Sequence, residues 1–193
     1  VVRRRSIAEL GLTRHWLGRS LVLQLVFAAF LYINTLAKVQ LPPIEQLVPL
    51  VALALTIGFF EAVFWRGWVL QRLEEAFGVV PAVLLGSLLY AAYHIGYGMN
   101  VDEMEFLFFI GVMFALVFLT TRSVLVLWPV FQPMGQLITL MKDGLELPVL
   151  ASLGFIDILA SLLAAGVIDR GARFAPEFGS RRLRQGADEL EFV

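Results

Sequence analysis

The feature that most constrains this chain is the apolar run over residues 47–60, which no charged side chain interrupts. The run continues as far as Arg72, with Glu61 and Arg66 as the only charged residues on the way. A segment of this length and hydrophobicity can cross a bilayer as a helix, whereas a transmembrane β-strand needs about ten residues of alternating character. Because the run does not alternate, it predicts a helix in lipid.

The rest of the chain has the same character. Of 193 residues, 59% are hydrophobic and 16% are charged, and the mean hydropathy is +0.81, whereas soluble domains are roughly half apolar and a quarter charged. We therefore predict an all-α, polytopic transmembrane helical bundle of about six spans. The predicted spans are residues 16–38, 47–72, 80–97, 104–121, 123–141 and 148–168.

Basic residues gather at both ends of the chain, after the second span and after the fourth. The opposite loops carry only Lys38 and Lys142, so the positive-inside rule predicts that both termini are cytoplasmic. We divide the chain into a cytoplasmic segment 1–15, a bundle 16–168 with its core at 47–140, and a polar cytoplasmic tail 169–193. Residues 7–16 fit either a short interfacial helix or an ordinary flanking loop.

Composition also excludes some functions. The chain has no cysteine, which rules out disulfides, thiol catalysis and cysteine metal sites. A net charge of -1 leaves no concentrated basic surface for nucleic acid, so we expect membrane lipids and no nucleic acid as partners. Because the sequence begins with Val1 rather than Met, we expect a longer parent protein in which a further span could precede this one.

Ionisable side chains at membrane depth are costly, so each one is a candidate functional residue that faces the bundle interior. They are Glu61, Arg66, His94 and Asp157, with Gln132 and Gln136 as uncharged companions. In an α-helix, Glu61 and Arg66 would lie about 140° apart, so each is expected to find a partner elsewhere. The alternative to a functional role is a structural hydrogen bond between helices, and for Arg66 it is a side chain that reaches toward the cytoplasmic headgroups.

The predicted depths of these residues in the membrane favour a shared site. At about 1.5 Å per residue from the cytoplasmic ends of their spans, Glu61 lies about 16 Å deep, His94 about 21 Å and Gln132 about 14 Å. Tyr90 is four residues before His94 and therefore shares its helix face. A carboxylate, an imidazole and an amide that meet in a water-accessible pocket would suit hydrolysis, with the carboxylate as base and an amide N–H on the oxyanion.

Three motifs resemble those of the CPBP family of intramembrane proteases, which includes the CAAX prenyl endopeptidases and the bacterial Abi proteins. The first is Phe-Glu-Ala-Val-Phe-Trp-Arg-Gly-Trp at 60–68, and the second is Tyr-Ala-Ala-Tyr-His at 90–94. The third is Trp-Pro-Val-Phe-Gln-Pro-Met-Gly-Gln at 128–136. The chain departs from the family pattern at Ala62, which replaces a second glutamate, and at Gln132 and Gln136, which replace histidine and asparagine.

The resemblance implies an intramembrane endopeptidase that hydrolyses a membrane-associated peptide, which is prenylated if the CAAX branch applies. Glu61 would activate the attacking water with His94 as its partner, and Gln132 would contact the oxyanion. Arg66, Tyr90 and Gln136 would support these three residues. The family carries the label metalloprotease, but zinc normally takes three good protein ligands and this chain offers only Glu61 and His94. We therefore expect a glutamate-activated water and no stable zinc or other cofactor.

Two other functions stay open at this point. A catalytically inactive relative that binds or scaffolds membrane peptides would account for Ala62 and Gln132. A small proton-coupled transporter would use Glu61, His94 and Asp157 as a proton path, which requires Asp157 to face the same cavity as the other two.

Overall fold

A computed structural model describes residues 7–13, 16–162 and 164, which contain helices and no strand. The α-helices are α1 (Leu17–Leu36), α2 (Ile44–Glu61), α3 (Gln71–Phe77), α4 (Val79–Tyr93), α5 (Val101–Thr121) and α6 (Phe131–Lys142). A π-helix, η2 (Ala62–Leu70), joins α2 to α3, and the 3-10 helices are η1 (Ile7–Leu10), η3 (His94–Tyr97) and η4 (Val124–Val126). A further apolar helix covers Val149–Leu162. The predicted helical bundle is confirmed, while the predicted tail 169–193 lies outside the described residues.

In the part of the chain that the structure describes, four helices are long and apolar enough to cross a membrane, namely Leu17–Leu36, Ile44–Phe77, Val79–Tyr97 and Val101–Thr121. They correspond to the first four predicted spans. The fifth prediction, one helix over 123–141, is wrong, because the chain makes only the short turn η4 and then stays irregular until α6 begins at Phe131. The physical reason is Pro129, since proline donates no backbone hydrogen bond and disfavours helical geometry in the residue before it. The sixth segment is helical over Val149–Leu162.

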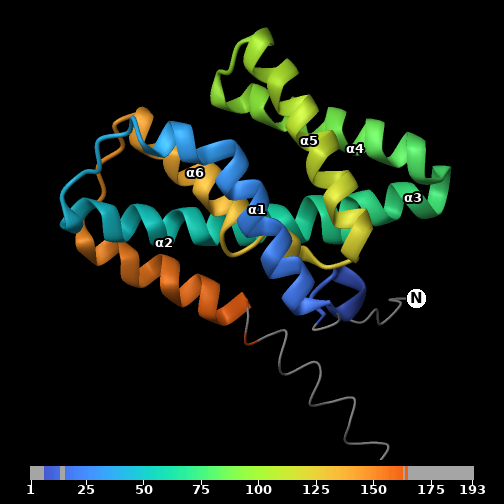
Figure 1. Ribbon diagram of the computed structural model, residues 1–193, viewed down its shortest axis with the longest axis horizontal. Coiled ribbons are helices and arrows are strands. Elements are labelled where there is room, and N and C mark those ends of the chain that lie inside the picture. Colours follow the sequence, from blue (N-terminus) through green and yellow to red (C-terminus); the bar gives the residue numbers. More distant parts are fainter. Residues whose placement is uncertain (1–6, 14–15, 163, 165–193) are drawn as a thin grey trace, which may run out of the picture.

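One long rod organises the bundle (Figure 1). Its 34 residues, Ile44–Phe77, comprise α2, η2 and α3 end to end. The pair α1 and α6 lies over the half that contains α2, and the hairpin of α4 and α5 lies over the half that contains α3. The helix Val149–Leu162 packs on α2, where the Thr56 hydroxyl donates to the Phe155 carbonyl at 3.0 Å. The middle of the rod therefore faces both helix pairs.

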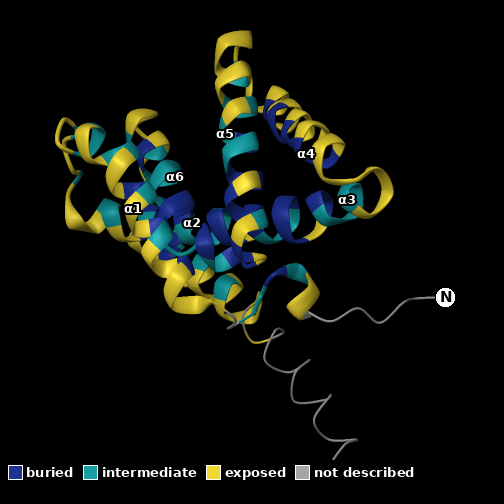
Figure 2. Cartoon of the chain, turned by 45° about the vertical axis from the view of Figure 1, so that its right-hand side comes forward, coloured by how far each residue is buried: buried dark blue, intermediate teal, exposed yellow. Residues whose placement is uncertain are grey.

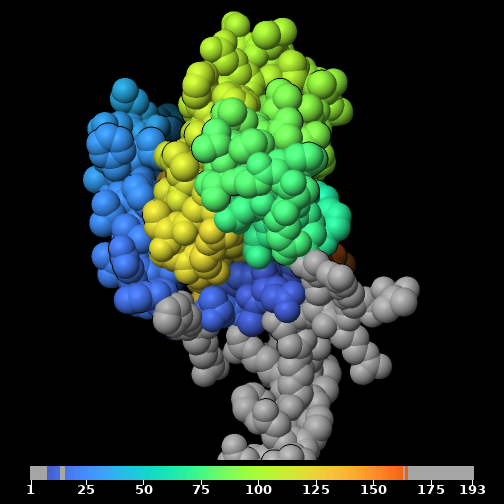
Figure 3. Space-filling model, turned by 90° about the vertical axis from the view of Figure 1, so that its right-hand side faces the viewer, coloured from blue at the N-terminus to red at the C-terminus, as the bar shows by residue number. Residues whose placement is uncertain are grey.

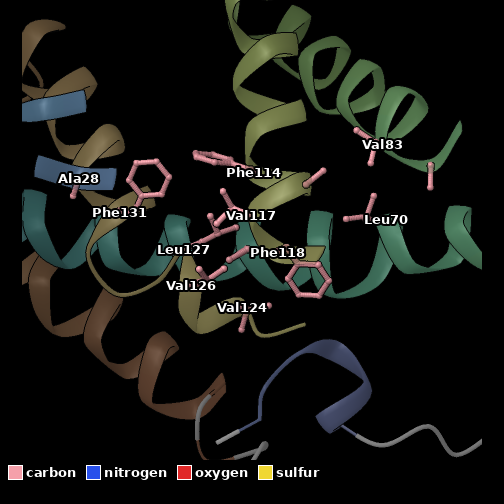
Figure 4. Close-up of a cluster of buried hydrophobic side chains, with 13 residues drawn as sticks. Ala28, Leu70, Val83, Phe114, Val117, Phe118, Val124, Val126, Leu127 and Phe131 are labelled. Carbon is pink, nitrogen blue, oxygen red and sulfur yellow. The ribbon is translucent and has the colours of Figure 1, made fainter. Parts of the chain in front are cut away.

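Burial follows this arrangement (Figure 2). Buried residues concentrate around the middle of the rod, while the outer faces of α1, α4 and α5 are exposed and apolar, as lipid-facing surfaces are. From the side, α5 lies between α1 and α4 (Figure 3). The core includes Phe114 of α5 and Phe131 of α6, whose ring centroids are 5.4 Å apart in an edge-on arrangement (Figure 4). This contact joins the two helix pairs above the rod.

The segment before α1 packs against the bundle instead of lying free as a flanking loop. The Gln71 side chain donates to the Glu9 carbonyl at 2.6 Å, and the Val124 N–H donates to the Gly11 carbonyl at 3.0 Å. Gly11 is buried at a φ of 78°, a conformation that glycine adopts without strain. The backbone of Leu10 also lies directly against Gly67 of η2. Residues 8–12 thus cover the end of the bundle beneath the π-helix.

Gly67→Ala is expected to destabilise the protein. A Cβ atom at this position would collide with the backbone carbonyl of Leu10, which cannot rotate away as a side chain can. Overpacking of this kind costs roughly 1–3 kcal/mol. The measurement is thermal unfolding in detergent, with Gly18→Ala as the control because nothing lies within 4 Å of its Cβ position. Equal stability of the two variants would contradict the packing of residues 8–12 on η2.

Charged side chains also mark the two ends of the bundle. Arg122 makes two hydrogen bonds to Glu74, at 2.5 and 2.7 Å, and this hydrogen bonding raises the pKa of Arg122. At the opposite end, Lys38 and Lys142 line one pocket, so the two loops predicted to share a side of the membrane do lie together. Which compartment each end faces stays a prediction.

Candidate functional site

The site is centred on Glu61, the last residue of α2, whose side chain is 3% exposed. Three side chains from two other helices point their donors at the same oxygen, Oε2. Gln132 of α6 donates at 2.6 Å, Gln136 of α6 at 3.2 Å and the Tyr90 hydroxyl of α4 at 3.5 Å. Burying a carboxylate is costly unless it is hydrogen-bonded, and these donors supply the compensation. The structure thus brings Glu61 and both glutamines together.

A close crossing of α2 and α6 allows this contact. Gly58 of α2 lies against Pro133 of α6, so that a Cβ at Gly58 would be only 2.8 Å from the proline ring. The indole N–H of Trp128 donates to the Leu55 carbonyl at 3.0 Å, and its ring packs edge-on against Phe59 at 5.3 Å. Because Gly58 carries no side chain at the crossing, Gln132, the residue of α6 just before Pro133, can reach Glu61.

His94 borders the site from the end of α4. It is the first residue of η3 and is 6% exposed, and its Nδ1 lies 2.8 Å from the Tyr90 carbonyl. Since a carbonyl only accepts, Nδ1 carries the proton and Nε2 of the neutral ring is an acceptor. The ring packs against Tyr90 at 4.9 Å and against Tyr93 at 5.0 Å, and it interacts electrostatically with Glu61. The four-residue spacing predicted the contact with Tyr90.

Arg66 has direct contacts with residues other than Glu61, which confirms the prediction that it finds a partner elsewhere. Its guanidinium is buried, 2% exposed, and lies 4.5 Å above the Tyr90 ring and 5.0 Å from the Phe114 ring. It also donates to the Gly111 carbonyl at 3.4 Å and interacts electrostatically with Glu61. Hydrogen bonds in the π-helix η2 link residues five apart, and the Arg66 side chain of this helix has its contacts on α4 and α5. Arg66 therefore belongs to the site and does not extend toward lipid headgroups.

Residues 43–130 match the family model described as type II CAAX prenyl endopeptidase Rce1-like. This stretch of the chain is similar to the Rce1-like family. No curated protein and no solved structure matches the chain. The Rce1-like stretch contains Glu61, Arg66, Tyr90 and His94, and it ends two residues before Gln132. The family match therefore covers the carboxylate and the imidazole but not the two glutamines.

The residues around the Rce1-like carboxylate do not fit zinc. Zinc takes three or four good nitrogen, sulfur or carboxylate ligands, and among the described residues no three His, Cys, Asp or Glu side chains group together. The nearest amides turn their N–H groups, not their oxygens, toward Glu61. The chemistry that the arrangement supports is proton transfer and charge stabilisation by side chains.

Two further polar residues, Asp157 and Gln24, lie outside the Rce1-like stretch. Asp157 is exposed on the helix Val149–Leu162 and has no hydrogen bond or ion pair with Glu61 or His94, so the condition for a proton path through all three is not met. Gln24 of α1 was not predicted, although it is 0% exposed and bonds to the chain next to Gln132. Its one sequence signal is an amide inside an otherwise apolar span.

Proposed function

We propose that this protein is an intramembrane endopeptidase in which Glu61 activates water to hydrolyse a membrane-held peptide. The observation that carries the proposal is the buried Glu61 carboxylate, on which donors from α4 and α6 converge beside His94. The similarity of residues 43–130 to the Rce1-like family supports the same class of reaction.

In the proposed reaction, Glu61 takes a proton from a water molecule while the water oxygen attacks the carbonyl carbon of the peptide bond. The three donors occupy Oε2, so Oε1 is the oxygen assigned to the water. The negative charge that develops on the carbonyl oxygen is stabilised by the positive charge of Arg66 and by the second N–H of Gln132, because an amide nitrogen has two donors. The proton then passes from Glu61 to the leaving nitrogen as the peptide bond breaks.

His94 is assigned to the orientation of the water. Its Nδ1 is engaged by the Tyr90 carbonyl, which leaves Nε2 as an acceptor for the second hydrogen of the water. A water held between Oε1 and Nε2 would be fixed in both position and orientation, and such positioning contributes strongly to rate.

The proposed substrate is a peptide anchored at the cytoplasmic leaflet, where the basic ends of the chain are predicted to lie. The family description names CAAX prenyl endopeptidases, so a C-terminal peptide with a prenylated cysteine is the first substrate to test. A peptide of the same sequence anchored by an acyl chain separates recognition of the prenyl group from simple attachment to the membrane.

His94→Ala is expected to reduce hydrolysis about 100-fold or more, the contribution of one positioned acid–base group. Purified protein is reconstituted into vesicles, and cleavage of both anchored peptides is followed by mass spectrometry. Asp157→Asn is the control, because it replaces the carboxylate of a side chain in the same bundle that has no hydrogen bond to the site. Equal cleavage by wild type and His94→Ala would remove His94 from the reaction.

A second function is favoured by one observation. Ala62 occupies the place of the second motif glutamate, is 0% exposed and packs in the hydrophobic core, so that place has no carboxylate. A non-catalytic relative would bind a membrane peptide at Glu61 and release it intact.

The binding function predicts that wild-type vesicles retain the anchored peptide without cleaving it. It also predicts that Gln132→His, which restores the imidazole of the family motif, gains hydrolysis. The endopeptidase proposal predicts cleavage by the wild type in the same assay, so the two functions give opposite results before any substitution is made.

A further inference from the structure

The start of α6 has backbone N–H groups for which the helix itself supplies no hydrogen-bond acceptor. The first backbone N–H groups of a helix have no partner inside the helix, and in lipid no water replaces it at low cost. The residue before α6, Val130, has an apolar side chain, and no side-chain cap bond comes from it. The N–H groups at this end must therefore find acceptors elsewhere.

Two of the backbone N–H groups at the start of α6 have backbone acceptors. The Gln132 N–H donates to the Leu127 carbonyl at 2.8 Å, and the Met134 N–H donates to the Val130 carbonyl at 2.9 Å. Pro133 has no N–H to satisfy. The N–H groups of Val130 and Phe131 are the two that remain.

Gln24 of α1 accepts hydrogen bonds from both of these N–H groups. Its Oε1 accepts from the Val130 N–H at 2.9 Å and from the Phe131 N–H at 3.4 Å. Its Nε2 donates to the Leu125 carbonyl at 3.2 Å, on the other side of the irregular segment. Gln24 lies about 10 Å along α1 from Leu17 and is 0% exposed, so this amide has no competing contact with solvent.

We propose that Gln24 is a positioning residue of the site: it caps α6 from another helix and thereby places Gln132 against Glu61. Gln132 immediately follows Phe131, whose N–H the cap holds, so a shift at this point moves the Gln132 amide directly. The inference rests on the proposed function for its catalytic meaning. The structural part of the inference is the link from Gln24 to the Gln132–Glu61 hydrogen bond. This part does not depend on whether the protein is an enzyme.

The test therefore measures the chemical reactivity of the Glu61 carboxyl group. Dicyclohexylcarbodiimide, an apolar reagent, adds to the neutral form of a membrane-embedded carboxyl group, and peptide mapping by mass spectrometry measures the adduct at Glu61. Donors on Oε2 favour the charged form, so losing the Gln132 donor should speed the labelling. For a hydrogen bond to a charged group the expected effect is about ten-fold or more. Gln132→Leu measures this loss directly.

Gln24→Leu is expected to raise the labelling rate of Glu61 as much as Gln132→Leu does, and the double variant should add no further increase, because both changes break one linked contact. Ser20→Ala is the matched control. Ser20 is also 0% exposed, lies four residues earlier on α1 and has no hydrogen-bond partner for its hydroxyl oxygen. In Ser20→Ala, Glu61 should be labelled at the wild-type rate.

Unchanged labelling in Gln24→Leu, or independent effects in the double variant, would overturn the proposal. If Gln24→Leu does not yield a monodisperse protein in detergent, Gln24→Glu replaces it, since a neutral carboxyl group keeps an acceptor oxygen for Val130 and Phe131 and an O–H for Leu125. This variant should label Glu61 at the wild-type rate, and faster labelling would count against the cap. Wild-type protein that cleaves no peptide would refute the endopeptidase but leave these labelling results intact.

Discussion

Replacing Glu61 by glutamine is expected to abolish peptide hydrolysis, with a loss of about 10²–10⁴-fold, the range for removing a general base. The amide cannot take a proton from water at neutral pH. The substitution keeps the size of the side chain, and an amide oxygen can still accept from Gln132, Gln136 and Tyr90. The loss should therefore arise from chemistry and not from unfolding.

The measurement is cleavage of the membrane-anchored peptide in vesicles, with the thermal unfolding midpoint in detergent recorded for each variant. Asp157→Asn undergoes the same change of carboxylate to amide at an exposed position and should cleave at the wild-type rate. Hydrolysis by Glu61→Gln at the wild-type rate would show that another group activates the water.

Gly58→Ala has the second largest expected effect, because it separates the helices that form the site. The new Cβ would lie 2.8–3.1 Å from the ring and nitrogen of Pro133, so α6 must move away from α2. Displacing a catalytic group by about 1 Å costs on the order of 10²-fold in rate, and the overpacking costs roughly 1–3 kcal/mol in stability. Both hydrolysis and stability should fall.

Gly154→Ala provides the control for this change, since it is also a helical glycine but has nothing within 4 Å of its Cβ position. It should match or slightly exceed the stability of the wild type, because alanine favours helix more than glycine does. If Gly58→Ala cleaved peptide as fast as Gly154→Ala, the close crossing of α2 and α6 would not be needed for the site.

Hydrophobic length predicted the first four spans well, because each is a continuous apolar helix. It failed for residues 123–141, where the composition is just as apolar but the chain is irregular before α6. Apolar runs report burial and lipid contact, and they do not by themselves specify helical hydrogen bonding. The relevant local signal was Pro129, and the N–H groups of Val130 and Phe131 after it find their acceptor in Gln24, from a distant part of the sequence.

Depth along the predicted helices was enough to place Glu61 and Gln132 in one layer, since the rise per residue is nearly constant. The relative direction of Glu61 and Arg66 was not predictable in the same way. Their 140° separation follows from α-helical geometry, and the hydrogen bonding of η2 departs from it. No periodicity in an almost uniformly apolar segment distinguishes the two kinds of helix.

The geometry of the site also depends on the number of residues in the π-helix. A π-helical stretch accommodates more residues per turn than an α-helix, so deleting one residue between Ala62 and Leu70 would let the rod close into a regular α-helix. The residues within the wide turn, Arg66 among them, would then face in other directions relative to Glu61. The direction in which the carboxylate faces its neighbours is thus set by a residue count, which no single-residue substitution would reveal.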